Sequence, residues 1–414
     1  MVKVRKAAVN FIFITVLLDI IGFGIIIPVL PGLLEGMMGI DANEAAVYGG
    51  YLLFAFAITQ FLFSPFMGNL SDQYGRRPII LLSLFGFVID YLLLAVAPTF
   101  AWLVVGRLIA GFFGASYSTA NSYIADVSTE ENRAKNFGML GAAFGVGFIV
   151  GPLLGGLLGE IGLRVPFYVA AGLTFINLLY GYFILPESLP VEHRRTFEWK
   201  KANPISTLKK IGNYKNIGYL LMAFFIINLG SHAVQSNWTY FTMFKFDWSE
   251  GMVGLSLAVV GVVVGVVQAI LAQKAADTFG AAKSIIYGFG MYTIGMFLFS
   301  MASTTWMMFL FLIPYALGGI AMPNLQSYMV SKVSTKEQGE LQGGLTSLIS
   351  LSTIIGPIMM TQIFFYFTSE RSSFQFAGAP FLLGGILMLI SFVIVYFVFR
   401  NHRVATFSNR IDER

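Results

Sequence analysis

Long apolar segments are the feature that most limits what this chain can fold into. Apolar blocks of roughly 20 residues recur along its 414 residues, which is the length that an α-helix needs to cross the hydrocarbon core of a bilayer. Hydrophobic residues make up 57% of the sequence and charged residues only 11%, so a water-soluble fold could not bury this much apolar surface. We therefore expect an all-α membrane protein with lipid as the solvent for most of the chain.

The apolar blocks predict twelve transmembrane helices in two pseudo-symmetric bundles of six. The spans are expected at residues 8–34, 45–67, 78–97, 100–125, 135–158 and 164–185, and then at 217–243, 251–273, 282–302, 305–330, 340–366 and 375–399. The expected parts are an N-terminal bundle (1–185), a cytoplasmic linker (186–216), a C-terminal bundle (217–402) and a cytoplasmic tail (403–414).

The distribution of basic residues predicts the orientation of the chain. Of the 26 Lys and Arg residues, only Arg164, Lys245 and Arg371 fall outside when the N-terminus is placed inside, and Arg107 lies within a span. Because cationic loops stay on the cytoplasmic side, both termini are expected in the cytoplasm. The net charge of +5 comes from short loops and not from one soluble face, so we expect no nucleic-acid partner.

Several function classes are excluded by residues that the sequence lacks. It contains no cysteine, which excludes disulfides, thiolate metal sites and cysteine nucleophiles. We find no phosphate-binding glycine loop with a lysine and no nucleophile close to a histidine, so the sequence gives no support to an enzyme.

Short strings recur at one nearly constant spacing. Ser122-Tyr123 returns as Ser327-Tyr328, and Gly151-Pro152 returns as Gly356-Pro357, both 205 positions later (328 minus 123, and 357 minus 152). Such self-similarity predicts two related halves, which is the architecture of carriers that work by alternating access.

Two oppositely charged residues, Asp90 and Arg107, fall inside consecutive spans at similar depth. Asp90 lies eight residues before Pro98 at the external turn, and Arg107 lies nine residues after it. Both are therefore about 12 to 14 Å from that turn, and they can form an ion pair. The pair is either a structural bridge or a part of proton coupling.

Asp19 is the third ionisable residue inside a span. No cation shares its depth in the neighbouring sequence, and Gly22, Gly24, Pro28 and Pro31 loosen the helix after it. A carboxyl group in such a place needs a partner, a water-filled cavity or a function. Our hypothesis is that Asp19 takes up and releases the coupling proton, with Arg107 biasing this step. The alternative is a satisfied structural carboxylate.

The second half carries no acid inside its predicted spans, and offers neutral hydrogen-bonding and aromatic groups instead. These suit a polar, ring-containing substrate. The candidates are Asn228, His232, Gln235 and Trp238 in one span and Asn324 and Gln326 in another.

The loop after the second span reads Gly68-Asn-Leu-Ser-Asp72-Gln-Tyr-Gly75-Arg76. It resembles the signature of the major facilitator superfamily, which has a glycine, an aspartate four residues later, another glycine and paired basic residues. The resemblance implies that Asp72 and Arg76 form a cytoplasmic gate, to which Asp126 also belongs. Gln73 stands where the family usually has a basic residue.

The fifth span contains a cluster of small residues and one proline. Such residues allow helices to approach closely, and plain helix packing is one interpretation. The cluster also resembles the antiporter motif of drug/proton exchangers, which sugar symporters of the superfamily generally lack. Its members are Gly147, Gly151, Pro152, Gly155 and Gly156.

Further strings are similar to the tetracycline/proton antiporters. They include Leu18–Gly24, Pro28–Pro31, Asp90–Ala95 and Glu337–Gly343. This resemblance implies export of a tetracycline, chelated to a divalent cation such as Mg²⁺, in exchange for a proton. The matching positions are Asp19, Gln60, Asp72, Arg76, Asp90, Arg107, Asp126, Gln326 and Gln342.

Two positions depart from that family. Tyr292 stands where the antiporters place an acid, and Val264 stands near an expected histidine. Tyr292 is counted among the substrate-binding candidates with Gln60.

We therefore expect a proton-driven drug exporter of the bacterial inner membrane, a monomer without an obligate protein partner, cofactor or metal site of its own. The alternatives are a multidrug/proton antiporter of other specificity, a proton-coupled nutrient symporter, and a receptor that transports nothing.

Overall fold

The computed structural model describes residues 2–114, 116–129, 131–198, 214, 217–334, 337–370 and 372–412, with the backbone alone at 2–8, 116–117, 133–134 and 401–412. These residues form helices and no strand. Among them, twelve stretches are long and apolar enough to cross a membrane. The predicted all-α class and the number of spans are confirmed.

The helices of the first half have these bounds: α1 (Val2–Ile26), α2 (Leu30–Met38), α3 (Ala42–Tyr74), α4 (Arg76–Val96), α5 (Phe100–Phe113), α6 (Ser116–Val127), α7 (Arg133–Ile161) and α8 (Val165–Ile184), followed by a short 3₁₀ turn at Val191–His193.

Those of the second half are α10 (Gly218–Phe246), α11 (Glu250–Val266), a π-helical turn (Val267–Leu271), α12 (Ala272–Phe279), α13 (Ala281–Met301), α14 (Thr305–Leu317), a 3₁₀ turn (Gly318–Ile320), α15 (Ala321–Val330), α16 (Gln338–Thr368) and α17 (Ala379–Asp412).

The first span is shorter than predicted. The expected helix over 8–34 ends at Ile26, a turn follows at residues 27–29, and the chain continues as the separate helix α2. Pro28 accounts for the break, because proline lacks an N–H and disfavours helical backbone at the residue before it. The apolar pattern therefore marks the buried segment correctly but not the point at which the helix ends.

The internal repeat is visible in the backbone itself. Helices α4 and α13 have the same length, and both begin after a glycine with positive φ: Gly75 at 105° and Gly280 at 80°. The residues before α5 and α14, Thr99 and Thr304, have nearly equal dihedral angles. Each pair is separated by 205 positions, as the sequence repeat predicted.

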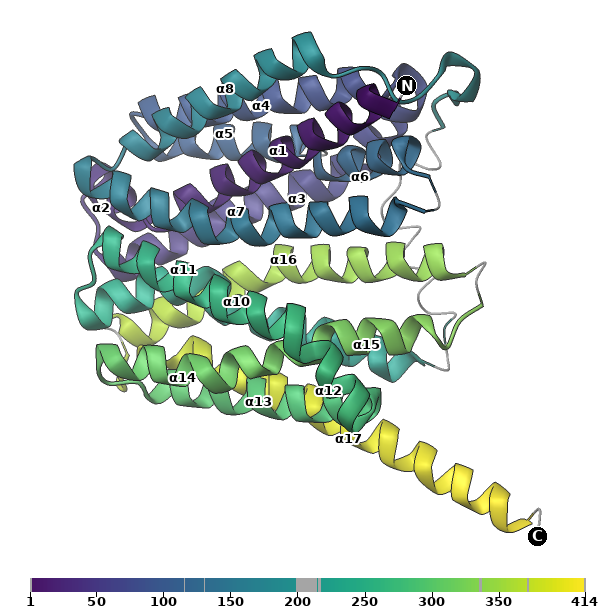
Figure 1. The fold of residues 1–414 in the computed structure, drawn as a ribbon. Coiled ribbons are helices and arrows are strands. Elements are labelled where there is room, and N and C mark those ends of the chain that lie inside the picture. The colour runs from purple at the N-terminus through teal and green to yellow at the C-terminus, as the bar shows by residue number, and fades with distance from the viewer. Residues whose placement is uncertain are drawn as a thin grey trace. The chain divides into compact units, whose positions relative to one another are not determined.

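The chain divides into two compact units (Figure 1). The first comprises Met1–Pro204 with Thr242–Gly261, and the second comprises Ile205–Phe241 with Val262–Arg414. The segment Thr242–Gly261 belongs to the first unit because it packs on α7, where Gly254 lies against the carbonyl of Pro152. The bundle limits expected near 185 and 217 stay a prediction.

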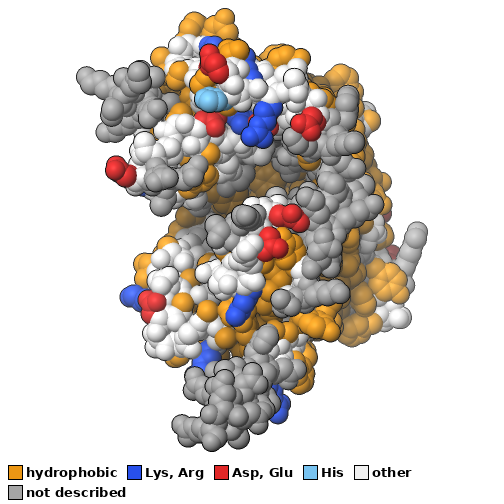
Figure 2. Space-filling model, turned by 90° about the vertical axis from the view of Figure 1, so that its right-hand side faces the viewer, with side chains coloured by type: hydrophobic (Ala, Val, Ile, Leu, Met, Phe, Trp, Pro, Cys, Tyr) orange, Lys and Arg blue, Asp and Glu red, His pale blue; other side chains and the backbone are white. Residues whose placement is uncertain are grey.

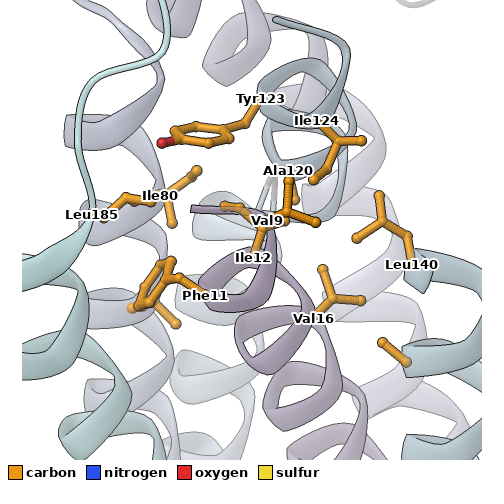
Figure 3. Packing of buried hydrophobic residues seen from close by; sticks show 12 residues of the cluster. Val9, Phe11, Ile12, Val16, Ile80, Ala120, Tyr123, Ile124, Leu140 and Leu185 are labelled. Atoms are coloured by element: carbon orange, nitrogen blue, oxygen red, sulfur yellow. The ribbon is translucent and has the colours of Figure 1, made fainter. Parts of the chain in front are cut away.

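Buried apolar side chains hold the helices of the first unit together. Figure 3 shows Phe11, Ile12 and Val16 of α1 in one cluster with Ile80 of α4 and Leu140 of α7. All five are at most 2% exposed. Close packing of this kind fixes the depth and the rotation of each helix relative to its neighbours within the unit.

Charged side chains gather on the face seen in Figure 2, which is the end where the N-terminus lies, whereas hydrophobic side chains cover the flank. This separation suits helices whose middle parts contact lipid and whose ends contact water.

Candidate functional site

The expected ion pair between Asp90 and Arg107 is present in the first unit. Nη2 of Arg107 donates to Oδ2 of Asp90, and the two residues are 0% and 8% exposed. Gly106 makes room for the carboxylate, because a Cβ there would lie 2.9 Å from Asp90 Oδ1. Since removing one partner would leave a buried charge uncompensated, the two residues depend on each other.

Tyr91 links this pair to α1, and the sequence analysis does not single it out. It is 4% exposed, and its hydroxyl occupies the space that a Cβ at Gly22 would fill. Because Tyr91 follows Asp90 in the sequence, α4 places both the ion pair and this hydroxyl on the side of α1. The signal available in the sequence was the glycine three residues after Asp19, which lies on the same side of the helix.

Asp19 itself is half-buried on α1, and its Oδ2 is shielded from solvent. The three predicted coupling residues thus lie on α1, α4 and α5 of one unit. The structure pairs two of them directly, and Tyr91, which follows Asp90 in the sequence, contacts the helix that carries the third. Their role in proton coupling stays a prediction.

The three predicted gate residues also meet, at the charged end of the first unit. Nη1 of Arg76 lies 2.5 Å from Asp72 Oδ1, and its Nε lies 3.2 Å from Asp126 Oδ2. Arg76 Nη1 also donates to Ser71 Oγ at 2.6 Å. One guanidinium therefore joins the end of α3 to the end of α6 with charge-assisted hydrogen bonds.

The chain after α8 is part of this cluster, which the sequence analysis missed. Glu187 accepts hydrogen bonds from the backbone N–H of Arg76 at 2.8 Å and of Arg77 at 3.2 Å. Ser188 Oγ donates to Asp126 Oδ2 at 3.1 Å. The N–H groups at the start of a helix lack partners within the helix, and Glu187 supplies acceptors for two of them at the start of α4.

A further backbone contact ties the same segment to the gate. The N–H of Arg195 donates to the carbonyl of Asp72 at 3.0 Å, and Asn69 Nδ2 donates to the carbonyl of Glu198 at 2.8 Å. Residues 186–198, which we call the strap, thus contact α3, α4 and α6.

The glycines of α7 form a packing face against α1. Gly147, Gly151 and Gly155 recur every four residues and so share one side of the helix. A Cβ at Gly151 would come within 2.8 Å of the carbonyl of Ile21, and one at Gly155 would overlap the backbone of Ile25. The backbones of α1 and α7 are therefore in direct contact, which small residues permit.

A second face of α7 packs on α11. A Cβ at Gly156 would overlap the carbonyl of Glu250, and one at Gly254 would overlap that of Pro152. Ser249, just before α11, donates to Glu160 at 3.1 Å. The predicted antiporter motif thus serves close packing on both sides of α7, and its role in exchange stays a prediction.

Three candidate substrate-binding residues share one face of α10 in the second unit. Asn228, His232 and Gln235 are spaced four and three residues apart. Gln235 is exposed, whereas His232 is 4% exposed and its ring lies against Gly356 of α16.

Two aromatic candidates are packed inside the second unit. Trp238 is 3% exposed and lies edge-on to Phe299, with ring centres 5.3 Å apart. Tyr292 lies 5.2 Å from the ring of Tyr315, and a Cβ at Gly318 would overlap its ring. In this structure both side chains contact protein on most of their surface.

The remaining candidates differ in their surroundings. Asn324 is buried and donates to the carbonyl of Ala272 at 3.1 Å, next to the π-helical turn. Gln326 is half-buried.

Gln60 lies in the first unit, where its Nε2 donates to the carbonyl of Gly114 at 3.0 Å. Gln342 is exposed on α16, and Val264 is half-buried on α11.

A family comparison agrees with this architecture. The family model of the Major Facilitator Superfamily matches residues 12–266 and again residues 220–413. The chain belongs to the major facilitator superfamily. Together the two matches cover residues 12–413 of this superfamily member.

Among curated proteins, this superfamily member is similar to tetracycline resistance proteins. The class C protein of Escherichia coli is 40% identical over 376 residues, covering 91% of this chain and 93% of that protein. The class H protein of Pasteurella multocida is 37% identical over 397 residues, covering 95% of this chain and 96% of that protein.

Solved structures of transporters share the fold. The human organic anion transporter MFSD10 aligns with a TM-score of 0.71 and 23% identity, covering 94% of this chain and 99% of its own. A bacterial homologue of the human lysosomal transporter Spinster aligns with a TM-score of 0.76 and 16% identity, covering 96% and 97%. The protein is thus a multi-pass membrane transporter with the major facilitator fold, and not an enzyme.

Proposed function

We propose that this protein exports a tetracycline, carried as its chelate with a divalent cation such as Mg²⁺, in exchange for protons. The observation that carries the proposal is the similarity to tetracycline resistance proteins. Six of them are 36–40% identical over 87–96% of this chain. The bacterial sources of these relatives favour the bacterial inner membrane, and the positive-inside distribution favours a cytoplasmic location for both termini and the linker.

Proton exchange requires an acid inside the membrane whose charge changes during the cycle, and Asp19 supports this role. Its Oδ2 is shielded from solvent, and Tyr91, which follows Asp90 of the ion pair, contacts α1 at Gly22, three residues after Asp19. Protonation of Asp19 removes one negative charge from this group. The balance of charge around Arg107 then shifts, so binding of the proton is coupled to the arrangement of α1, α4 and α5.

A second candidate is a multidrug/proton antiporter of other specificity. It is favoured by Tyr292, which stands where the tetracycline antiporters place an acid. In this protein the position holds a buried aromatic ring, packed against Tyr315. An uncharged aromatic group there suits amphiphilic substrates without a chelated cation.

Uptake into everted membrane vesicles tests the proposal. With an imposed proton gradient and a divalent cation present, wild-type vesicles should accumulate tetracycline. We expect Asp19→Asn to reduce this to the level of vesicles without the protein, because the amide cannot carry the proton. Omission of the divalent cation should also abolish accumulation.

Asp247→Asn is the matched control. Asp247 is an exposed acid outside the spans with φ of 53°, a conformation that asparagine adopts readily, so uptake should remain near the wild-type level. Unchanged uptake in Asp19→Asn would contradict the coupling role. Accumulation of ethidium without tetracycline would favour the multidrug antiporter instead.

A further inference from the structure

A groove lies between α13 and α17, two helices of the second unit. Its volume is about 260 Å³, which is slightly below the usual size of pockets for drug-sized ligands. It is lined by Ala282, Lys283, Ile286, Tyr287, Tyr396, Phe399 and Arg400.

The groove lining follows one stripe on each helix. On α13, Lys283 is followed one turn later by Tyr287; on α17, Arg400 is preceded one turn earlier by Tyr396. Residues four apart lie on the same side of a helix, so each stripe has its cation at one end of the membrane-spanning stretch and its aromatic ring one turn deeper. The two cations therefore lie at the same level, at the end predicted to face the cytoplasm.

Each stripe continues as exposed apolar surface. Beyond Tyr287 on α13 come Met291 and Ile294, which are 36% and 48% exposed. Beyond Tyr396 on α17, Val393 is 41% exposed. Such surface faces acyl chains when the helices cross a bilayer. The helices stay in contact at that depth, because Gly290 lies against Phe392.

The positive charge of the groove is not balanced by the described part of the protein. Neither Lys283 nor Arg400 forms an ion pair with a described carboxylate. A third cation is close by, since Lys332 lies over the ring of Tyr328, and this ring packs on Phe399 of the groove.

We propose that the groove between α13 and α17 binds the phosphodiester headgroup of an anionic phospholipid from the cytoplasmic leaflet. Lys283 and Arg400 would contact the phosphate, the tyrosines would lie at the interface, and the acyl chains would follow the two apolar stripes. Basic pockets between transmembrane helices on the cytoplasmic side are suited to such headgroups. A free phosphate has the same charge but makes no use of the apolar surface that continues from the groove.

Lipid retention by the purified full-length protein tests this site. The protein is reconstituted in nanodiscs of phosphatidylcholine with phosphatidylglycerol and then released into detergent, and native mass spectrometry counts the bound lipids. We expect wild-type protein to retain phosphatidylglycerol in preference to phosphatidylcholine. The double variant Lys283→Gln with Arg400→Gln should lower that preference on the order of tenfold.

A matched control removes two exposed cations elsewhere. Lys135 and Lys274 lie at helix ends on the predicted cytoplasmic side and outside the groove, so Lys135→Gln with Lys274→Gln should leave the preference unchanged. Lys283→Arg with Arg400→Lys keeps both charges and should retain the lipid. Equal loss in the control variant would overturn the proposal, because it would indicate general charge attraction.

Two further measurements on wild-type protein alone test the proposed lipid site. If the double glutamine variant does not fold, the phosphatidylglycerol preference of the wild type must still weaken as salt rises, since the contact is between charges. Equal retention of both lipids, or displacement of phosphatidylglycerol by inorganic phosphate at similar concentration, would overturn the lipid site.

Discussion

At the scale of single residues, glycines decide where the charged groups of the first unit can lie. Gly106 leaves space for the Asp90 carboxylate, and Gly22 leaves space for the Tyr91 hydroxyl. The sequence indicated Gly22 only as a residue that loosens a helix. Its role in the structure is to admit a side chain from another helix, and this brings Tyr91 close to the coupling candidates.

Gly22→Ala is predicted to destabilise the first unit. The added Cβ would overlap the Tyr91 hydroxyl, and filling a packed site with an extra methyl group costs about 1–3 kcal/mol. A lower midpoint of thermal unfolding in detergent, compared with the wild type, would show this destabilisation. Gly22→Ala with Tyr91→Phe should recover part of the loss, because the atom nearest the new methyl is gone.

The control for this change is Gly145→Ala on α7, where nothing lies within 4 Å of an added Cβ. Its midpoint should stay within error of the wild type. If Gly22→Ala behaved like Gly145→Ala, the close contact between α1 and Tyr91 would not exist in solution.

At the scale of elements, the start of α4 depends on residues from a distant segment. Gly75 joins α3 to α4 with φ of 105°, a conformation that residues with a Cβ rarely adopt. Glu187 then supplies acceptors for the N–H groups of Arg76 and Arg77. The strap therefore positions Arg76, whose side chain contacts Asp72 and Asp126.

Glu187→Ala is predicted to weaken this corner of the protein. Loss of a side-chain cap costs about 0.5–2 kcal/mol, and the strap would lose its contact with α4. Thermal unfolding and the rate of proteolysis within the strap would report the change. Glu192→Ala provides the comparison, since Glu192 is exposed in the same segment; equal effects in both variants would contradict a capping role.

At the scale of the whole molecule, the helices of the first half recur in the second half, but the Asp90–Arg107 ion pair does not. The 205-residue offset that relates α4 to α13 places Gly295 at the position of Asp90 and Leu312 at that of Arg107. Gly295 serves packing, because a Cβ there would lie 2.7 Å from the backbone of Tyr315. The two halves thus share a scaffold while only the first has an ion pair at this place.

Segments far apart in the sequence also meet outside the spans. Glu35 of α2 and Glu250 of α11 line one cavity of about 430 Å³ in the first unit. Burial raises the pKa of the half-buried Glu35 carboxyl above its ordinary value of 4.5, and the charges of Glu250 and Asp41 raise it further.

The contribution of the Glu35 carboxyl to the stability of the folded protein is therefore predicted to fall as the pH rises. A raised folded-state pKa means that folding favours the protonated form, so this contribution is fully present below pH 4.5 and is lost as pH rises through the folded pKa. Glu35→Gln should flatten the decline in the unfolding midpoint as the pH rises above 4.5.

Glu370→Gln is the control, because Glu370 is exposed and does not line this cavity. Its pH profile should match the wild type. If the pH profile of Glu35→Gln also matched that of the wild type, the neighbours of the Glu35 carboxyl would not perturb it.

The sequence by itself determined the features that depend on position along a helix. Block length predicted the spans, the spacing of repeated strings predicted related halves, and similar distances from Pro98 indicated that Asp90 and Arg107 can pair, as they do. Depth in a membrane follows directly from residue count, because the helix rise is constant.

Only the tertiary structure decided which side chains from different helices touch. The partners of Glu187 are backbone N–H groups, which carry no mark in the sequence, and the neighbour of Gly22 depends on how α4 is rotated about its axis. Rotation and contact are set by packing among all the helices, and a linear pattern does not contain them.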